Sequence, residues 1–228
     1  LAHIKGKFKA PSTTHNPSLE PKDLRLLMEA ITCDSMAIPT RLLIEWQLHT
    51  MVRPNEAAGS RWAEIDLNNK TWTIPKGRMK KVGTSKQWEE RKDHIIPLTP
   101  QTLAILNLMK PFSGHLEYVF PNQRDRDAKA GPDSANNALK RAGLKGKQTA
   151  HGMRTIASST LNEEQFNPDV IEAALYHLDP NEQRRTYNRT DYFNQRCVMM
   201  EWWSNRIEEA TTGNMSMAAS TRGLRAIK

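Results

Sequence analysis

The segment RWAEIDLNNKTWTIP, residues 61–75, decides the fold class of this chain. Apolar and polar residues alternate on both sides of Asn68-Asn69-Lys70, which predicts strands at 61–66 and 71–75 joined by a turn. A third strand is expected at 94–98, after a connection from 76 to 93 that is longer than ordinary hairpin loops. The sequence therefore predicts one small antiparallel sheet.

Helical periodicity flanks this sheet on both sides. Before it, helices are expected from Pro21, from Pro39 to Met51, and from Pro54 to near Gly59, since proline suits the first turn of a helix. After it, helices are expected at 100–110, 133–142, 150–163, 168–178, about 180–188 and 191–209. We therefore predict a mainly α-helical α+β domain with a small antiparallel β-sheet.

The chain of 228 residues suits one such domain with two flanking segments. Residues 1–17 are basic and rich in proline and hydroxyl residues, which is typical of an interdomain linker. Residues 18–210 contain no internal repeat and no second linker, so they form the predicted domain. Residues 211–228 are small, polar and basic, and we expect a flexible tail.

The charge balance indicates a polyanionic partner. The 33 Lys and Arg exceed the 25 Asp and Glu, giving a net charge of +8, and seven basic residues stand in the 76–93 connection. Such a surface favours nucleic acid, although a simply basic protein would look the same. No apolar run is long enough to span a membrane, and two cysteines form no disulfide framework, so a reducing cytoplasm is expected.

Several residues could bind and attack a phosphate. His151 and Arg154 are three apart at the start of a predicted helix and would share one face, where an anion binds well. Arg53 stands at a proline-marked break, and Glu56 could orient it. The alternatives are a solvated first turn for His151 and Arg154, and a surface ion pair for Arg53 and Glu56.

His177 and Tyr187 complete the candidates. His177 ends a predicted helix, where a histidine usually acts as a cap. Tyr187 lies among three arginines, whose positive field favours the phenolate, although a tyrosine with its ring in the core is the alternative. Nucleotide-binding loops, zinc-ligand spacings and dense carboxylate clusters are absent from the sequence, so we expect no metal and no cofactor.

Together these residues resemble the tyrosine recombinase (phage integrase) family, particularly integrases of satellite phages and pathogenicity islands. The resemblance covers about residues 18–210 and depends on the order and spacing of short motifs. The motifs are Thr50–Glu56, Trp72–Pro75 followed by Arg78-Met-Lys80, His94–Leu98, Tyr118–Pro121, His151–Arg154, Ala174–His177, Tyr187–Arg189 and Met200–Trp203.

The resemblance implies the catalytic core of a DNA breaking and rejoining enzyme. Tyr187 would attack a DNA phosphate, forming a 3′-phosphotyrosine and releasing a 5′-hydroxyl without metal or ATP. The roles implied for the others are phosphate clamps for Arg53 and Arg154, protonation of the leaving oxygen by Lys80, proton transfer by His151, a phosphate hydrogen bond from His177, and support of Arg53 by Glu56.

Three departures from the family pattern leave alternatives open. A bulky Tyr176 precedes His177, where a small residue is usual; Lys81 rivals Lys80; and Tyr192 rivals Tyr187 as the nucleophile. The chain also resembles an isolated catalytic domain, because such integrases carry further DNA-binding domains before it.

The resemblance also implies the partners and the location. The partners are double-stranded DNA attachment sites, further copies of the protein in a recombination tetramer, and an excisionase or a host DNA-bending protein, in the bacterial cytoplasm at the nucleoid. A catalytically silent DNA-binding module from a degenerate integrase is the alternative, and a basic scaffold protein is a third class.

Overall fold

The computed structural model describes residues 16–33, 35–81, 83–89, 91–131, 133–177 and 191–211. The expected helix at 180–188, the candidate Tyr187, most of the expected linker and nearly all of the expected tail lie outside the described residues. No helix in the described ranges is long and apolar enough to cross a membrane.

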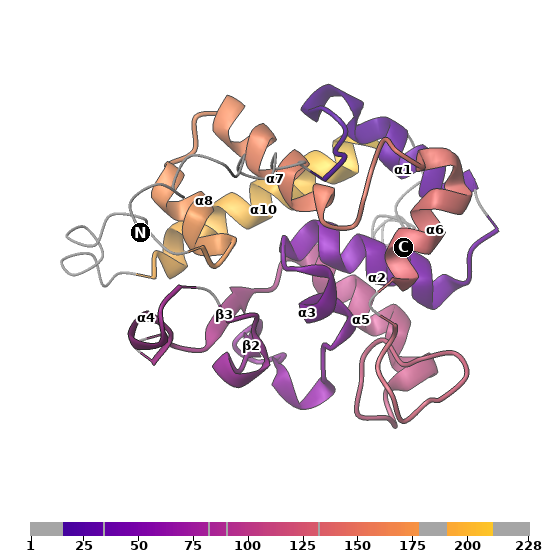
Figure 1. Ribbon diagram of the computed structural model, residues 1–228, viewed down its shortest axis with the longest axis horizontal. Helices are drawn as coiled ribbons and strands as arrows, with labels where there is room; N and C mark the ends of the chain where they lie inside the picture. Colours follow the sequence, from indigo (N-terminus) through magenta and orange to yellow (C-terminus); the bar gives the residue numbers. More distant parts are fainter. Residues whose placement is uncertain are drawn as a thin grey trace, which may run out of the picture.

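The helices form most of the domain and the small sheet lies at one side (Figure 1). α2 runs through the centre and packs against α3, α5, α6, α7 and α10. The long helices are α1 (Leu24–Cys33), α2 (Ile38–Thr50), α5 (Pro100–Ser113), α7 (Gly152–Glu163) and α10 (Phe193–Ala210). The shorter ones are η1 (Pro21–Asp23), α3 (Pro54–Ala58), α6 (Ser134–Leu139), η4 (Lys140–Leu144) and α8 (Pro168–Ala174). The mainly helical prediction is confirmed.

Three antiparallel strands form the sheet in the order β1 (Ile65–Asp66), β2 (Thr71–Ile74) and β3 (His94–Pro97). Register is set by Ile65 opposite Trp72 and by Trp72 opposite Ile96. In the turn, a carboxylate oxygen of Asp66 accepts hydrogen bonds from the amides of Asn68 and Asn69, both at 2.9 Å. The hairpin and the third strand are confirmed.

The first strand is shorter than predicted, because residues 62–64 form the 3-10 helix η2 (Trp62–Glu64). Two side-chain contacts hold this turn. The indole of Trp62 donates to the carbonyl of Ser113 at 2.8 Å, and the Glu64 carboxylate accepts from the Trp72 indole at 2.9 Å. Tertiary bonds therefore override the alternating pattern at this point.

The connection between β2 and β3 contains two short helices, η3 (Lys76–Arg78) and α4 (Ser85–Glu89). Its ends are joined, because the Lys76 amide donates to the Asp93 carboxylate at 2.8 Å. Arg78 makes a fork of two hydrogen bonds to Glu64, at 2.8 and 2.7 Å. This ion pair ties the start of the connection to the body of the domain.

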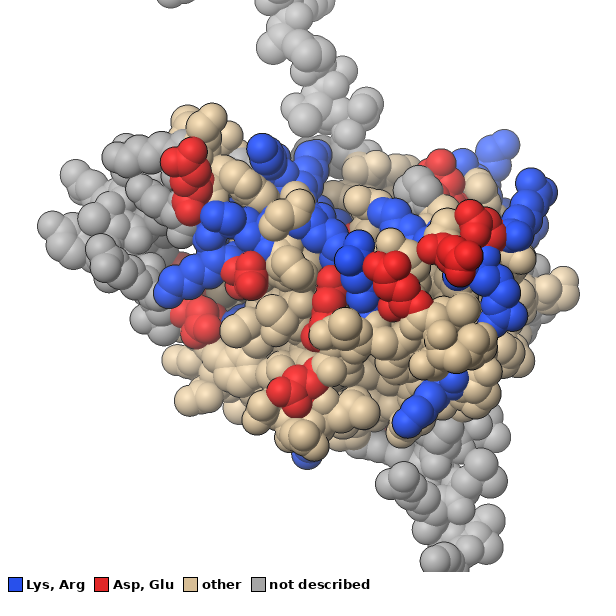
Figure 2. Space-filling model, turned by 90° about the horizontal axis from the view of Figure 1, so that it is seen from below, with Lys and Arg blue, Asp and Glu red and all other residues tan. Residues whose placement is uncertain are grey.

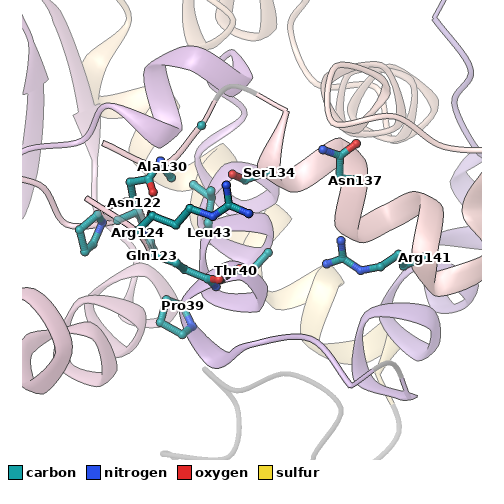
Figure 3. A pocket seen from close by; sticks show the side chains of 13 residues that line it. Pro39, Thr40, Leu43, Asn122, Gln123, Arg124, Ala130, Ser134, Asn137 and Arg141 are labelled. Atoms are coloured by element: carbon teal, nitrogen blue, oxygen red, sulfur yellow. Dashed lines mark hydrogen bonds between the residues drawn. The ribbon is translucent and has the colours of Figure 1, made fainter. Parts of the chain in front are cut away.

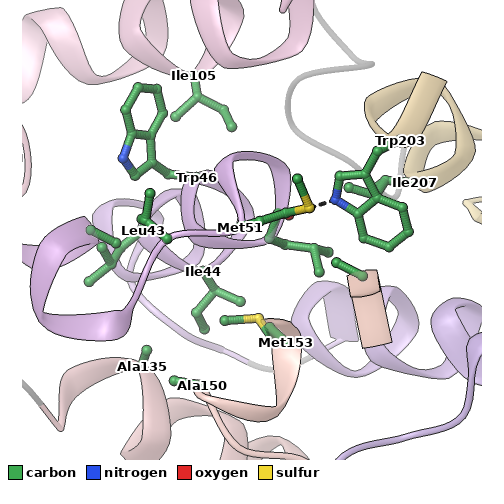
Figure 4. Close-up of a cluster of buried hydrophobic side chains, with 14 of the residues drawn as sticks. Leu43, Ile44, Trp46, Met51, Ile105, Ala135, Ala150, Met153, Trp203 and Ile207 are labelled. Carbon is green, nitrogen blue, oxygen red and sulfur yellow. Dashed lines mark hydrogen bonds between the residues drawn. The ribbon is translucent and has the colours of Figure 1, made fainter. Parts of the chain in front are cut away.

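The core is centred on α2, which is buried continuously from Leu42 to Thr50. Trp46 packs against Trp72 and Phe120, with ring centroids 5.0 and 6.1 Å apart. On another side of α2, Met51 and Trp203 lie close together (Figure 4). Burial of large aromatic side chains dominates core stability, so α2 provides a rigid base for the loops at its end.

α8 ends at Ala174, earlier than the predicted helix 168–178. Tyr176 follows in the left-handed backbone region, with φ at +53°, and this stops the helix before His177. The helix expected at 133–142 also divides: α6 continues into the wider turn η4, where Gly143 has φ at +83°.

His49 on α2 predicts a specific acid sensitivity. The ring is fully buried, its Nδ1 pairs with the Ser204 hydroxyl at 2.9 Å, and burial lowers the His49 pKa to about 3. Below pH 6.5, unfolded His49 takes up a proton that folded His49 does not. The free energy of unfolding should therefore fall by up to about 1.4 kcal/mol per pH unit from this group.

Urea unfolding at a series of pH values measures this slope. His49→Gln should show a shallower slope than the wild-type chain, while buried His94 continues to contribute in both. Equal slopes would show that His49 does not resist protonation.

Candidate active site

Arg154, on the first turn of α7, is the centre of the candidate site and is only 5% exposed. Its Nη1 donates to the carbonyl of Met51 at 2.5 Å, and its Nη2 donates to the carbonyl of Leu175 at 2.7 Å. Nη2 also lies 2.9 Å from Nε2 of His177. All three partners are neutral atoms, so within the described residues this buried charge has no carboxylate in direct contact.

Burial, helped by the nearby charge of Arg53, lowers the pKa of Arg154 to about 10. The guanidinium still carries its charge at neutral pH. A buried cation held by carbonyl oxygens, with a second cation beside it, favours an anion at its open side.

Arg53 joins the end of α2 to the start of α3, as expected from Pro54. Its Nη1 donates to one oxygen of Glu56 at 3.2 Å, and its backbone amide donates to the other oxygen at 3.0 Å. Glu56 is 3% exposed and the Arg53 side chain 14%. The structure therefore places Glu56 where it restrains both the backbone and the side chain of Arg53.

His177 lies between the carboxylate of Glu172 and the guanidinium of Arg154. Its Nδ1 is 2.8 Å from a carboxylate oxygen of Glu172, which assigns the proton to Nδ1 and leaves Nε2 to accept from Arg154. Burial and the charge of Arg154 lower the pKa of His177, while Glu172 opposes this shift. The neutral ring is favoured until another negative charge approaches.

His151 and Lys80 complete the group within the described residues. His151 is exposed just before α7, and Lys80 is exposed just after η3. Burial lowers the pKa of His151, and the charges of Arg154, Arg53, Lys80 and His177 add to this effect. These five side chains therefore share one electrostatic field, although they come from four separate segments.

Only one of the two candidate tyrosines, Tyr192, lies within the described residues. Tyr187 lies outside the described residues. Tyr192 immediately precedes α10, with φ at +53°, and is partly buried against the hydrophobic core. The choice between them remains a prediction from the sequence.

The sequence did not identify three neighbours of His177: Glu172, Tyr176 as a structural residue, and Arg91. Glu172 lies on α8, five residues before His177, and this spacing could have suggested the contact. Arg91 belongs to the basic connection and has no distinguishing spacing, yet it hydrogen-bonds to the backbone at Tyr176 and His177.

The candidate residues lie apart from the cavity of about 440 Å³ that is lined by the start of α2, residues 120–124, α6 and η4 (Figure 3). Arg124 and Arg141 line that cavity, and none of the five site residues does. On the face seen in Figure 2, Lys and Arg side chains form a band with acidic side chains among them. A basic surface of this kind suits an extended polyanion better than a small enclosed ligand.

Comparisons with known proteins identify the family of this chain. The profile described as the phage integrase family matches residues 17–193. The chain is 46% identical over 208 residues to prophage integrase IntA of Escherichia coli K12, covering 91% of this chain and 48% of that protein. It is 29% identical over 210 residues to the integrase of Enterobacteria phage P4, covering 89% and 48%. The chain spans about half the length of these relatives.

Two solved structures share the fold. The integrase from mycobacterium phage Brujita matches with a TM-score of 0.59 at 16% identity, over 91% of this chain and 67% of that chain. A lambda integrase dimer bound to a COC′ core site matches with a TM-score of 0.57 at 18% identity, over 78% and 63%. The expected recombinase-core fold is confirmed, and the chain belongs to the phage integrase (tyrosine recombinase) family, whose catalytic domain it matches.

Proposed function

We propose that this chain is the catalytic domain of a site-specific DNA recombinase that integrates or excises a mobile element. It cleaves and rejoins DNA through a covalent 3′-phosphotyrosine. The observation that carries this proposal is Arg154, a buried charge that is bonded, among the described residues, only to neutral atoms and lies beside His177. A DNA phosphate supplies the anion that this arrangement lacks.

Phosphate binding uses both arginines. Arg154 is fixed by the Met51 and Leu175 carbonyls, and Arg53 is fixed by Glu56. Charges that are positioned before the reaction stabilise the pentacoordinate phosphorane-like transition state without reorganising. The two guanidinium groups would contact the non-bridging oxygens, on which negative charge grows.

Proton transfer is divided among the other residues. The Tyr187 oxygen attacks phosphorus and loses its proton, with His151 assisting, while the bond to the 5′-oxygen breaks. Lys80 protonates that leaving oxygen, which departs as a 5′-hydroxyl. Rejoining reverses these steps with a 5′-hydroxyl from another strand, so no high-energy cofactor is consumed.

His177 needs a change of protonation to donate to the phosphate. Its Nε2 accepts from Arg154 in the present arrangement, and its Nδ1 proton points to Glu172. A phosphate beside Arg154 adds negative charge and raises the pKa of His177, which favours a proton on Nε2. Substrate binding thereby prepares the donor.

A nicked duplex tests the proposed function. A pool of short duplexes with random sequence around the nick is incubated with the chain in EDTA, and covalent adducts are separated under denaturing conditions. Cleavage near the nick releases a short fragment that diffuses away, so the adduct persists. Mass spectrometry of the digest should find DNA on the peptide containing Tyr187. Retarded DNA without any adduct would instead identify a catalytically silent DNA-binding module.

Arg154→Lys should slow adduct formation by about 10²–10³-fold, the usual loss for one oxyanion donor. A lysine cannot reproduce the fork that contacts two carbonyls and a phosphate. Single-turnover cleavage at saturating DNA measures this effect. Arg206→Lys, at an exposed ion pair with Glu209, is the matched control and should cleave like the wild-type chain. A similar small loss in both variants would remove Arg154 from the phosphate site.

The partners follow from the same proposal. The substrate is a pair of double-stranded attachment sites, and several copies of the protein assemble on them as a tetramer. An excisionase or a host DNA-bending protein would set the direction of recombination. The reaction takes place in the bacterial cytoplasm, on the chromosome.

A further inference from the structure

The turn that presents His177 has an unfavourable backbone conformation. Tyr176 has φ at +53°, in the left-handed region that glycine adopts freely and that a large side chain disfavours. Two hydrogen bonds close this turn after α8: the Tyr176 amide donates to Ala173, and the His177 amide donates to Glu172. Contacts from elsewhere must therefore stabilise Tyr176 in this conformation.

Arg91 provides those contacts. Its guanidinium carbon lies 3.6 Å from the centre of the Tyr176 ring. The same guanidinium donates to the Tyr176 carbonyl at 3.1 Å and to the His177 carbonyl at 3.3 Å. Ring stacking and a planar fork act together here, and lysine cannot supply both.

Two residues that follow Arg91 in the sequence also contact Tyr176. The Tyr176 hydroxyl donates to the Lys92 carbonyl at 2.6 Å, and the ring of buried His94 lies 4.8 Å from the Tyr176 ring. The end of the β2–β3 connection thus encloses the tyrosine that precedes His177.

Two arginines divide the carbonyl groups of this turn between them. Arg154 binds the carbonyl of Leu175, and Arg91 binds those of Tyr176 and His177. Arg91 is also close enough to Arg53 for the two charges to interact. The connection that carries Lys80 at its start therefore supports the histidine turn at its end.

We propose that Arg91 is a positioning residue, which holds His177 in its reactive orientation by stabilising the left-handed conformation of Tyr176. This role rests on the proposed function, because the part that His177 plays in cleavage is itself proposed. It explains how a bulky residue keeps a backbone conformation that glycine adopts more easily.

A double-mutant cycle tests the coupling. Arg91→Ala should lower single-turnover cleavage at saturating DNA by about 10- to 100-fold, the scale expected when a reacting group is displaced slightly. Tyr176→Gly should cleave at close to the wild-type rate, because glycine adopts this conformation without strain. Arg91→Ala combined with Tyr176→Gly should recover most of the loss. Equal losses in both backgrounds would overturn the proposal.

Two further variants separate positioning from DNA binding. Lys92→Ala removes one charge from the neighbouring exposed residue but keeps the carbonyl that binds Tyr176, so its cleavage rate should fall much less. Arg91→Lys keeps the charge and should recover only a small part of the rate. If the Arg91→Ala defect appears only as a higher DNA concentration for half-saturation, Arg91 is a DNA contact and the proposal fails.

Hydrogen exchange provides a measurement that needs no activity. In Arg91→Ala, the His177 amide should exchange faster than in the wild-type chain, while the amides of α2 keep their protection. Unchanged exchange at His177 contradicts the proposal. If the wild-type chain forms no adduct with DNA, the proposed function fails, and the exchange experiment still decides the role of Arg91.

Discussion

We expect Tyr187→Phe to abolish the covalent protein–DNA adduct and to leave DNA binding nearly unchanged. This is the largest effect that we expect from any single substitution, because the variant loses only the oxygen that we propose attacks phosphorus. The phenylalanine ring keeps the shape of the side chain, so the protein surface that contacts DNA stays the same. Adduct formation on the nicked duplex and gel retardation of an intact duplex measure the two properties separately.

Tyr192→Phe is the matched control for this experiment. Tyr192 is partly buried against the core at the first turn of α10, and its ring is retained in the variant. Adduct formation should therefore persist. The opposite pair of results, an adduct in Tyr187→Phe and none in Tyr192→Phe, would assign the nucleophile to Tyr192.

Lys80→Ala should reduce cleavage of ordinary DNA by about 10²–10⁴-fold, the usual contribution of general acid–base catalysis. Lys80 is exposed after η3, and its charge helps to lower the pKa of His151, so it lies near the candidate site. We expect DNA to order the connection that carries it. The rate of adduct formation on nicked duplexes provides the measurement.

A sulfur atom in place of the scissile 5′-oxygen distinguishes proton donation from DNA binding. Sulfur leaves readily without a proton, so Lys80→Ala should cleave the 5′-thio substrate at close to the wild-type rate. Lys81→Ala is the matched variant, because Lys81 is the neighbouring exposed lysine. Rescue of Lys81→Ala alone would transfer the role to Lys81, and rescue of neither would mean that the lysine acts by binding DNA.

Local patterns in the sequence predicted the elements whose stability is local. Alternation identified β2, where Trp72 and Ile74 are buried on one face, and Pro54 marked the start of α3 correctly. The pattern failed at residues 62–64, because bonds to Ser113 and Trp72 from distant segments decide their conformation. It also failed at the end of α8, where Arg91 stabilises an unfavourable conformation of Tyr176.

The sequence also predicted some parts of the candidate site and not others. The spacing of His151 and Arg154, and of Arg53 and Glu56, indicated neighbours that the structure does bring together. The Met51 and Leu175 carbonyls could not be predicted, because every residue has a carbonyl group and only the fold directs it. Nothing in the sequence distinguished Arg91 from the other basic residues of its connection.

The two hydrogen bonds from Arg154 to carbonyl groups give this side chain a structural role as well. This role affects which residues are retained when the gene loses its activity. Arg154 fastens the end of α2 to the end of α8, so selection for a folded protein alone would retain it after cleavage had ceased to matter. Lys80 is different, since its exposed side chain makes no hydrogen bond or ion pair with the described parts of the protein. If Lys80 protonates the leaving oxygen as we propose, an intact Lys80 indicates an active enzyme better than an intact Arg154 does, among copies of such a gene in bacterial genomes.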